Sequence, residues 1–593
     1  MAVMIFSLRM IIFLISLLIF FAVIELEGSA DACSSFLKFE LPSTRQAREP
    51  YRTGYHFQPC KNWMNDPNGP MVYKNVYHHF YQYNPDGVAW SPNIVWAHST
   101  STDLVNWTPH DEALYPSEPF DINGCWSGSA TILPGEKPAM FYTGINSQTE
   151  QVQNLAFPKN LSDPFLREWI KIPQNPLMMP TQANQIIVDS FRDPTTAWLG
   201  SDNRWRLVIG SRKNQTGLAI LYTSEDFLNW TMASHPFHSA KENGMWECPD
   251  FFPVSKSTPI GLDTSTNGAD VKHVLKISLF DIAKEYYTIG TYNLDKDVYI
   301  PDQGSVESDS GLRFDYGKFY ASKSFFDSVK NRRILWGWSN ESSSAEDDIK
   351  KGWSGLQTIP RTILLDKSGK QLVQWPIEEL EKLRTEHVKL PSSLIKGGSL
   401  HEVLGVATTQ ADVEVTFEIS NFEKAEVLDQ SWTDPQILCS NKDASVDGSL
   451  GPFGLLVLAS EGLQEYTAVF YRIYKSHNNK YVVLMCSDQS RSSLNENNDK
   501  TTYGAFVNVD PVHEKLSLRS LIDHSIVESF GGEGKVCITA RVYPTLVVDG
   551  DTRLYAFNYG RESVEISGSA WSMETAMINR SREEEYDRTE ESW

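Results

Sequence analysis

The pattern of apolar and polar residues between Tyr51 and about Trp375 predicts an antiparallel β structure. Short runs rich in Val, Ile, Tyr, Phe and Trp, such as Val76–Tyr83 and Arg333–Trp338, are separated by clusters of Gly, Pro, Asn and Asp. No amphipathic run of helical period lasts for more than about three turns in this region. The length of the region, about 300 residues, favours a β-propeller over a single β-sandwich.

A second β-rich region follows a short connector. The connector contains the best helical stretch of the chain, Pro376–Arg384, which begins with proline and places glutamates before its basic residues. Beyond about Gly397 the alternating pattern resumes, as in Tyr466–Tyr474, and continues for about 190 residues, the size of a β-sandwich. We therefore predict an N-terminal segment at 31–50, a propeller at 51–376, a linker at 377–396 and a sandwich module at 397–593.

The first 30 residues have the pattern of a secretory signal peptide. Arg9 precedes an apolar run at 10–24, and small residues follow at 28–30. A signal anchor is the competing interpretation. Six Asn-x-Ser/Thr sequons also fit secretion and predict a glycosylated surface. They begin at Asn106, Asn160, Asn214, Asn229, Asn340 and Asn579.

The charge of the chain limits its partners. Its 53 Lys and Arg residues against 75 Asp and Glu residues give a formal net charge of -22. A surface this acidic repels phosphate backbones and anionic lipids, so neither nucleic acid nor membrane is expected as a partner. A neutral sugar is not repelled, and some of the 17 Trp and 24 Tyr residues are candidates for packing against sugar rings. The pattern does not indicate an oligomeric state.

The cysteines predict at most a bridge or two. All seven are scattered along the chain without a CxxC pair, which argues against a metal cluster and against a disulfide-dense scaffold. Cys439 and Cys486 are the preferred pair because both lie in the distal half of the chain. We expect no metal and no cofactor.

Three short strings each place a carboxylate in a setting of aromatic, arginine or proline residues. Taken alone, each is an ordinary turn or strand end. Together, in this order, they closely resemble the signature of plant β-fructofuranosidases of glycoside hydrolase family 32, the group of cell-wall invertases and fructan exohydrolases. The strings are WMNDPNG at 63–69 with Asp66, FRDP at 191–194 with Asp193, and WECPD at 246–250 with Glu247.

Further strings extend the resemblance from about Tyr51 to about Trp571. They are YQYNP at 81–85, NIVWAHS at 93–99, WSGSAT at 126–131, YASKSFFD at 320–327 and LIDHSIVESF at 521–530. The resemblance implies an all-β fold, a five-bladed β-propeller followed by a C-terminal β-sandwich, with the active site in the central funnel. It also implies an address in the cell wall or apoplast, although a signal peptide serves the vacuolar route as well.

The resemblance further implies a retaining, exo-acting hydrolase of terminal β-fructofuranosyl groups. Cleavage through an oxocarbenium-like state needs an anion beneath the anomeric carbon and a proton donor on the departing oxygen. Asp66 matches the nucleophile, Glu247 the acid/base and Asp193 the stabiliser of the transition state, while Arg192 would damp the repulsion among the acids. The residues matched to substrate binding are Asn65, Gln82, Trp90, Trp126, Ser127, Arg192, Tyr320 and Phe280.

One segment bears on the choice between fructan and sucrose. In sucrose-splitting members, an Asp after the WECPD string, followed three residues later by Lys or Arg, helps to seat glucose. Aligned without a gap, these positions fall here on Phe280 and Ala283, and a phenyl ring cannot accept hydrogen bonds from a sugar. This favours a fructan exohydrolase acting on 2,1- or 2,6-linked fructans.

Two alternatives stay open at this stage. A loop slipped by one residue would restore the spacing through Asp281 and Lys284, and it would make the protein a cell-wall invertase acting on sucrose. A catalytically inactive sugar-binding relative is a more distant alternative, because such a relative is expected to lack one of the three acids, and all three are present.

Overall fold

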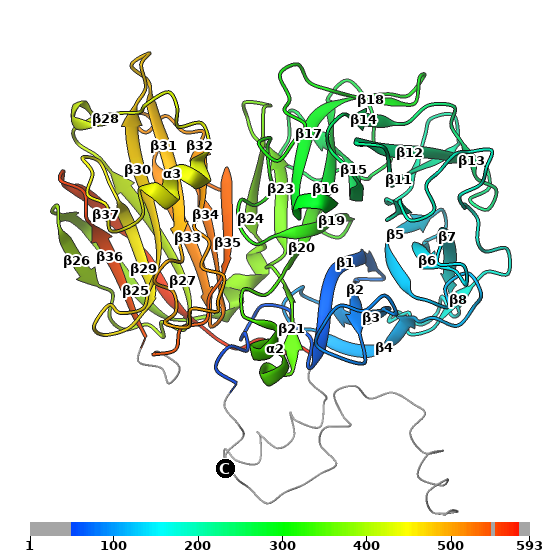
Figure 1. The fold of residues 1–593 in the computed structure, drawn as a ribbon, viewed down its shortest axis with the longest axis horizontal. Helices are drawn as coiled ribbons and strands as arrows, with labels where there is room; N and C mark the ends of the chain where they lie inside the picture. The colour runs from blue at the N-terminus through cyan, green and yellow to red at the C-terminus, as the bar shows by residue number, and fades with distance from the viewer. Residues whose placement is uncertain (1–48, 547–551, 580–593) are drawn as a thin grey trace, which may run out of the picture. The chain divides into compact units, whose positions relative to one another are not determined.

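The computed structural model describes residues 49–546 and 552–579, and the predicted signal peptide lies outside them. The N-terminal part folds into five antiparallel sheets that form a five-bladed β-propeller (Figure 1). Blade 1 holds β1 (Asn62–Tyr73), β2 (Val76–Asn84), β3 (Val95–Ser101), β4 (Thr108–Leu114) and the short β21 (Trp353–Ser354). Because β21 pairs in parallel with the start of β1, hydrogen bonds join the end of this part of the chain to its beginning.

The other four blades follow in chain order. Blade 2 holds β5 (Cys125–Leu133), β6 (Lys137–Ile145), β7 (Gln151–Pro158) and β8 (Trp169–Lys171). Blade 3 holds β9 (Phe191–Arg192), β10 (Trp198–Leu199), β11 (Trp205–Lys213), β12 (Thr216–Ser224), β13 (Thr231–Met232) and β14 (His238–Ala240). Blade 4 holds β15 (Trp246–Ser255), β16 (Val271–Leu279), the 3-10 turn η2 (Phe280–Ile282), β17 (Lys284–Asn293) and β18 (Val298–Pro301). Blade 5 holds β19 (Tyr320–Asp327), β20 (Arg332–Ser339), β22 (Leu356–Gln357), β23 (Arg361–Leu365) and β24 (Leu372–Pro376), with helix α2 (Ala345–Lys351) after β20.

The blades pack face to face, which explains the aromatic-rich strands. Every residue of β2 is buried, including His78 and His79. A strand covered on both faces does not show the simple alternation of a half-exposed strand. The strands β1, β5, β15 and β19 contact one another around the centre of the propeller. β1 contacts β5 and β19, and β15 contacts β19.

The C-terminal part is a β-sandwich of two antiparallel sheets. One sheet holds β25 (Arg384–Ile395), β37 (Val564–Met573), β27 (Gln410–Glu418), β33 (Leu516–Asp523), β34 (Ile526–Gly531) and β35 (Val536–Arg541). The other holds β26 (Ser399–Glu402), β36 (Arg553–Asn558), β29 (Phe453–Ala459), β30 (Thr467–Lys475), β31 (Tyr481–Asp488), β32 (Tyr503–Val507) and β28 (Glu426–Val427), with the short turn η4 (Phe422–Lys424) before β28. Inward-facing residues such as Val413, Leu455 and Ile538 form one continuous apolar core.

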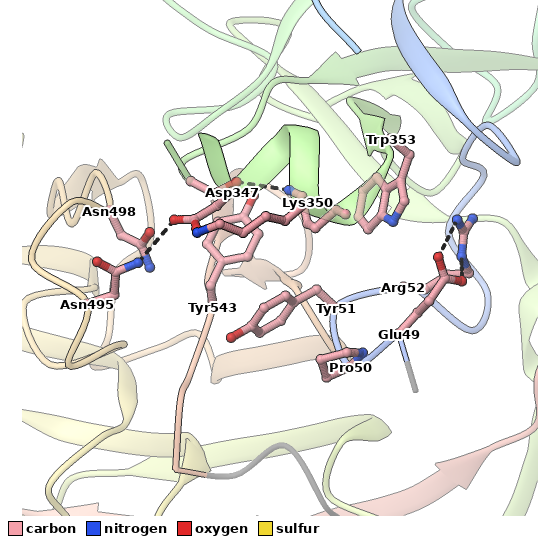
Figure 2. A pocket seen from close by; sticks show the side chains of 12 residues that line it. Glu49, Pro50, Tyr51, Arg52, Asp347, Lys350, Trp353, Asn495, Asn498 and Tyr543 are labelled. Atoms are coloured by element: carbon pink, nitrogen blue, oxygen red, sulfur yellow. Dashed lines mark hydrogen bonds and ion pairs between the residues drawn. The ribbon is translucent and has the colours of Figure 1, made fainter. Parts of the chain in front are cut away.

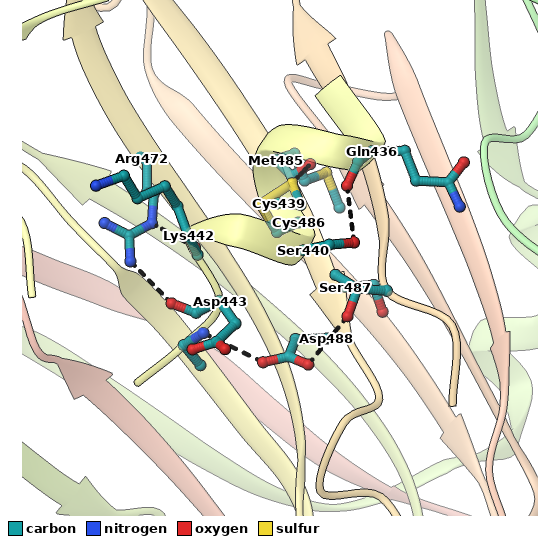
Figure 3. Close-up of a disulfide and its surroundings, with 12 residues drawn as sticks. Gln436, Cys439, Ser440, Lys442, Asp443, Arg472, Met485, Cys486, Ser487 and Asp488 are labelled. Carbon is teal, nitrogen blue, oxygen red and sulfur yellow. Dashed lines mark hydrogen bonds between the residues drawn. A yellow bond between two sulfur atoms is a disulfide. The ribbon is translucent and has the colours of Figure 1, made fainter. Parts of the chain in front are cut away.

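A disulfide fixes the helix of the sandwich to its sheet. Helix α3 (Pro435–Asn441) begins after Asp434, whose carboxylate accepts hydrogen bonds from the N–H groups of Gln436 and Ile437. Cys439 of this helix and Cys486 of β31, the pair preferred from the sequence, are joined by a disulfide (Figure 3). Among the described residues, Cys125, Cys248 and Cys537 are free and buried.

The prediction of a linker at 377–396 is wrong for most of that range. The expected helix is a short 3-10 helix, η3 (Glu378–Leu383), and strand β25 begins directly after it at Arg384. This strand lies at the edge of its sheet and, among the described strands, pairs with β37 alone. The half-buried apolar residues Val388 and Leu390 alternate with exposed ones, but Pro391 follows at once, so the apolar alternation is too short to predict a strand.

Propeller and sandwich share a buried cluster of charges. Arg361 of β23 donates to Asp315 and to Glu528 of β34, and the ring of His56 lies between Asp523 and Glu528. Burial raises the pKa of Glu528, but Arg361 and His56 outweigh that effect and hold it below its usual value. The string LIDHSIVESF thus supplies two carboxylates with which the sandwich binds the propeller.

The sequons differ in accessibility. Asn160, Asn214 and Asn229 are exposed, and Asn106 and Asn340 are half-buried. Asn579 is only 3% exposed, and its Nδ2 donates to the carbonyl oxygen of Gln58 at 2.9 Å. The prediction of a glycan at Asn579 is therefore wrong, because this amide faces the interior of the folded chain. Within the described ranges, no helix has the length and apolar character needed to cross a bilayer.

Candidate active site

Four central strands of the propeller carry a β-bulge near their first residues. In β1 the bulge contains Asn65 and Asp66, and in β5 it contains Ser127. In β15 it contains residues 248–249, and in β19 residues 321–322. A bulge bends a strand and redirects its side chains. In each of these strands, a residue singled out from the sequence lies within the bulge or directly before it.

The backbone around these bulges, and at Asp193 directly after β9, is locally unusual. Asp193, Cys248 and Ala321 have φ values of 67°, 44° and 52°, in the left-handed region that non-glycine residues rarely adopt. Each such residue costs on the order of 1 kcal/mol, and the surrounding structure must hold it in place. At Gly128 a Cβ atom would lie 2.0 Å from the carbonyl oxygen of Phe141, so the bulge of β5 requires glycine there.

Asp66 lies in a pocket of hydrogen-bond donors. Ser127 Oγ donates to its Oδ2 at 2.6 Å, and Asn65 Nδ2 donates to its Oδ1 at 3.0 Å. The thiol of Cys248 is 3.4 Å from the same Oδ2. Burial raises the pKa of Asp66, the bond from Ser127 opposes this, and the charge of Glu247 raises it further. Asp66 therefore stands as a hydrogen-bonded carboxyl group close to a second acid.

Asp193 is the most deeply buried of the three acids and is 3% exposed. Its Oδ2 accepts a hydrogen bond from the backbone N–H of Cys248 at 2.9 Å, and its own N–H donates to Thr143 Oγ1 at 2.9 Å. Burial raises its pKa to about 6; Arg192 acts against this, whereas Glu247 and Asp66 add to it. Since both other acids influence Asp193, the three carboxyl groups form one electrostatic cluster.

Glu247 is held from both sides. Its Oε1 accepts hydrogen bonds from Arg192 Nε at 2.9 Å and Nη2 at 2.7 Å. Its Oε2 accepts one from the hydroxyl of Tyr320 at 2.7 Å. Arg192 is only 5% exposed and also donates to Gln151. In this structure Arg192 binds the acid rather than facing solvent, and its charge opposes the repulsion within the cluster.

The remaining polar residues matched from the sequence lie close to Asp66 in the structure. Ser127 is 6% exposed and bonds Asp66 directly. Gln82 lies in β2 opposite the bulge of β1, and its Nε2 donates to the carbonyl oxygen of Cys125 at 3.1 Å. Trp63 Nε1 donates to Asn65 Oδ1 at 2.9 Å. Through these bonds the residues around Asp66 hold one another in place.

Two tryptophans and one phenylalanine are the apolar members of the set. The rings of Trp90 and Trp126 meet edge to face with centroids 6.0 Å apart, and Trp90 is 51% exposed. Trp126 Nε1 donates to the carbonyl oxygen of Pro92 at 3.0 Å. Phe280 is 54% exposed, and the guanidinium of Arg192 lies 5.1 Å from the centre of its ring. Exposed aromatic faces of this kind suit the C–H surface of a sugar.

The pocket shown in Figure 2 is separate from the site of the three acids. It has a volume of about 390 Å³, and none of the three acids lines it. Its polar groups are paired with one another: Asp347 binds Lys350 and Asn495, and Arg52 binds Glu49. Within the part of the chain that the structure describes, no group of three or more His, Cys, Asp or Glu side chains could hold a metal ion.

Comparison with known families decides the assignment of the chain. The model of the glycosyl hydrolases family 32 N-terminal domain matches residues 56–376, and that of the family 32 C-terminal domain matches residues 379–572. The chain belongs to glycosyl hydrolase family 32. Enzymes of this family combine the five-bladed propeller and the sandwich seen here.

Individual relatives of the family are similar over nearly the whole chain. Fructan 6-exohydrolase of Beta vulgaris is 64% identical over 90% of this chain and 88% of its own length. An insoluble isoenzyme of β-fructofuranosidase from Arabidopsis thaliana is 60% identical over 95% of this chain and 98% of its own. The crystal structure of fructan 1-exohydrolase IIa from Cichorium intybus superimposes with a TM-score of 0.88, at 53% identity, over 90% of this chain and 100% of that one.

Three residues of the candidate site were not predicted from the sequence. Cys248 contacts both Asp66 and Asp193, and Lys276 and Lys323 donate to the carbonyl oxygens of residues 248 and 249. Cys248 lies inside the WECPD string, which is the one signal that could have identified it. Lys276 lies between Leu275 and Ile277, which is also the pattern of a lysine that faces solvent, and Lys323 lies between two serines, which gives no sign of burial.

Proposed function

We propose that this family 32 protein is a retaining, exo-acting β-fructofuranosidase with Asp66 as its nucleophile. The observation that supports this most is the meeting of three acids from different blades around Cys248. Asp66 Oδ2 and Asp193 Oδ2 both contact the thiol of Cys248, and Glu247 directly precedes it. The charge of Glu247 acts on Asp66, and double displacement at an anomeric carbon needs two neighbouring carboxyl groups, about 5 Å apart.

The environment of Asp66 suits a nucleophile. Ser127 and Asn65 donate to its two oxygens and orient the carboxylate. When a fructosyl group enters, Asp66 attacks the anomeric carbon and forms a covalent fructosyl-enzyme. The donors to Asp66 then bind the oxygens of the ester, so little reorganisation accompanies the step.

The environment of Glu247 suits an acid that later acts as a base. Glu247 gives a proton to the departing oxygen as the glycosidic bond breaks, and it then takes one from the water that attacks the fructosyl-enzyme. Tyr320 and Arg192 hold its two oxygens on opposite sides. Asp193, which is fixed by Cys248 and Thr143, is placed to accept hydrogen bonds from fructose hydroxyls that tighten in the transition state.

The stereochemistry of transfer tests this mechanism. In water containing methanol, a retaining enzyme transfers the fructosyl group to methanol with the β configuration. We expect methyl β-D-fructofuranoside as the first-formed methyl product, identified by NMR. Methyl α-D-fructofuranoside as the first product would show inversion and would exclude Asp66 as a nucleophile.

Within this reaction we propose fructan, rather than sucrose, as the preferred substrate. Residues 280–283 form the tip of the hairpin between β16 and β17. There Phe280 lies over Arg192, next to Glu247, and offers no acceptor for sugar hydroxyls. Asp281, the acidic residue of this tip, packs against Gly244. A Cβ atom added to Gly244 would lie 2.0 Å from Asp281 Oδ2. Lys284 pairs with Asp309. These contacts favour the ungapped alignment over the slipped loop.

The alternative is an invertase, and it is supported by the insoluble β-fructofuranosidases among the relatives. Their names also support an address in the cell wall. Rates of fructose release from sucrose, 1-kestotriose, 6-kestotriose, inulin and levan separate the two functions. We expect faster release from at least one of the fructans than from sucrose, and preferential release from sucrose would establish the invertase.

A variant pair tests the role of the hairpin tip. Phe280→Asp should raise hydrolysis of sucrose relative to fructan by about 10-fold or more, because it adds an acceptor for glucose hydroxyls. Ile282→Asp is the matched control: it adds the same charge to the same tip, at a residue 49% exposed and without a contact to Arg192 among those described. An equal change in both variants would attribute the effect to charge alone.

A further inference from the structure

The bulge after Glu247 leaves backbone carbonyls without partners in the sheet. The register between β15 and β16 passes from Glu247–Ser278 to Asp250–Lys276, so two residues face the single residue Ile277. The φ of 44° at Cys248 turns the chain out of the strand conformation. A buried carbonyl that loses its ladder partner must be satisfied by another donor.

Two buried lysines supply these donors. Lys276 Nζ donates to the carbonyl oxygen of Cys248 at 2.7 Å, and Lys323 Nζ donates to that of Pro249 at 3.2 Å. The lysines are 0% and 2% exposed. An ammonium group is costly to bury, so two of them at adjacent carbonyls indicate that this bulge requires side-chain donors.

The same lysines link this bulge to the bulge of β19. Lys276 Nζ is 3.5 Å from Glu285 Oε2, which accepts a hydrogen bond from the N–H of Ser322 at 3.1 Å. Ser322 belongs to the bulge that follows Tyr320, and Lys323 is the next residue along β19. Each bulge therefore contributes to holding the other: Lys276 and Glu285 bridge them from one side, and Lys323 bridges them from the other.

This link fixes the partners of Glu247. Glu247 precedes the first bulge and Tyr320 precedes the second, and the Tyr320 hydroxyl donates to Glu247 Oε2 at 2.7 Å. The N–H of Cys248 binds Asp193 at 2.9 Å. We infer that Lys276 and Lys323 are positioning residues, which set the orientation of Glu247 relative to Tyr320 and Asp193. This inference rests on the proposed role of Glu247 as the acid/base.

Lys276→Met tests the inference, because methionine has a similar length but cannot donate. We expect kcat on 6-kestotriose and sucrose to fall by about 10- to 100-fold, since a shift of about 1 Å in a reacting group has an effect of this size. KM should change by less than about 3-fold, because Lys276 is placed to contact the bulge rather than substrate. Lys272→Met is the matched control: it lies in the same strand and loses a surface pair with Asp302, and kcat should stay at the wild-type value.

A double-variant cycle separates positioning from a loss of stability. If Lys276 acts through Glu247, the variant Lys276→Met/Glu247→Gln should be no more than about 3-fold slower than Glu247→Gln alone. A lysine that only stabilises the fold would slow both backgrounds by the same factor. Wild-type kcat in Lys276→Met, or multiplicative losses in the cycle, would overturn the inference.

The result also distinguishes this inference from the proposed function. Wild-type turnover in Glu247→Gln would remove Glu247 as the acid, whereas a slow Glu247→Gln with a fast Lys276→Met would overturn only the positioning role. If Lys276→Met does not fold because Glu285 is left buried without its partner, the double variant Lys276→Met/Glu285→Gln replaces it, because it removes both members of the pair. Lys323→Met is an independent second test. Wild-type kcat in the double variant and in Lys323→Met would then overturn the inference.

Discussion

Two clusters of buried acids in this protein have pKa values that are shifted in opposite directions. At the contact between propeller and sandwich, Asp523 and Glu528 are fully buried, and their pKa values are nevertheless lowered. At the proposed active site, the pKa values of Asp66 and Asp193 are raised. Burial raises the pKa in all four cases. The difference arises because the first pair faces His56 and Arg361, whereas the second pair faces another acid as well.

The comparison shows how one chain uses buried charge for two purposes. In the contact cluster each carboxylate has a cationic partner at hydrogen-bond distance, which suits a permanent structural connection. In the active-site cluster Arg192 binds Glu247 directly but is 4.0 Å from the nearest oxygen of Asp193. Carboxyl groups crowded together in this way are characteristic of sites that transfer protons.

The largest effect is expected at the nucleophile. Asp66→Ala removes the attacking oxygen and should lower kcat by at least about 10⁴-fold. Its melting temperature should not fall, because one of three mutually repelling acids is removed. Steady-state rates and thermal unfolding measure the two effects. A variant that still accumulates a covalent fructosyl-enzyme would require another nucleophile.

An intermediate effect is expected at the contact cluster. Arg361→Met leaves Asp315 buried without the cation that binds it and leaves Glu528 with His56 as its remaining partner, so the free energy of unfolding should fall by about 3–5 kcal/mol in denaturant titrations. The control is Arg561→Met, which removes a pair with Glu426 at the surface and should cost less than about 1 kcal/mol. Equal losses in the two variants would show that the buried cluster contributes no more than a surface pair.

The smallest effect depends on pH and distinguishes the two clusters by sign. The pKa of Asp193 is raised to about 6 in the folded protein, so the unfolded chain releases this proton first as the pH rises. Its contribution to stability is therefore present below about pH 4 and is lost between about pH 4 and pH 6. Asp523 and Glu528 behave in the opposite way, and their contribution is lost as the pH falls below about 4.

Asp193→Asn isolates the active-site half of this prediction. Relative to the wild type, it should gain stability on the order of 1–3 kcal/mol as the pH rises from about 4 to about 6, with no further gain above. Unfolding free energies measured at several pH values give the difference curve. A difference that does not vary with pH would mean that Asp193 titrates alike in the folded and unfolded chain.

Much of the architecture could be predicted because it rests on strand patterns and on strings with strong family character. The propeller and the sandwich follow from the alternating runs and from the resemblance. Strand β25 could not be predicted, because the apolar alternation of this edge strand is limited to Val388 and Leu390. Asn579 shows the same limit: the sequon is intact, but burial depends on contacts with residues far away in the chain.

The site was predictable only in part for a related reason. The three acids lie in distinctive strings, so the sequence indicates them even though they come from separate blades. Lys276 and Lys323 act on the backbone of a bulge, and a bulge leaves no clear trace in the sequence. The direction of the pKa shifts likewise depends on which acids meet in space, as the two clusters show.

The hairpin tip at residues 280–283 has a consequence for how such enzymes diversify. The tip lies outside the β16–β17 ladder, while the same two strands carry Lys276 and Glu285 in their paired portions. Replacing a tip residue therefore leaves the contacts of Lys276 and Glu285 in place. Under the proposed function, variation at this short turn changes which saccharide is accepted, while the acids that break the bond and the lysines behind them stay the same.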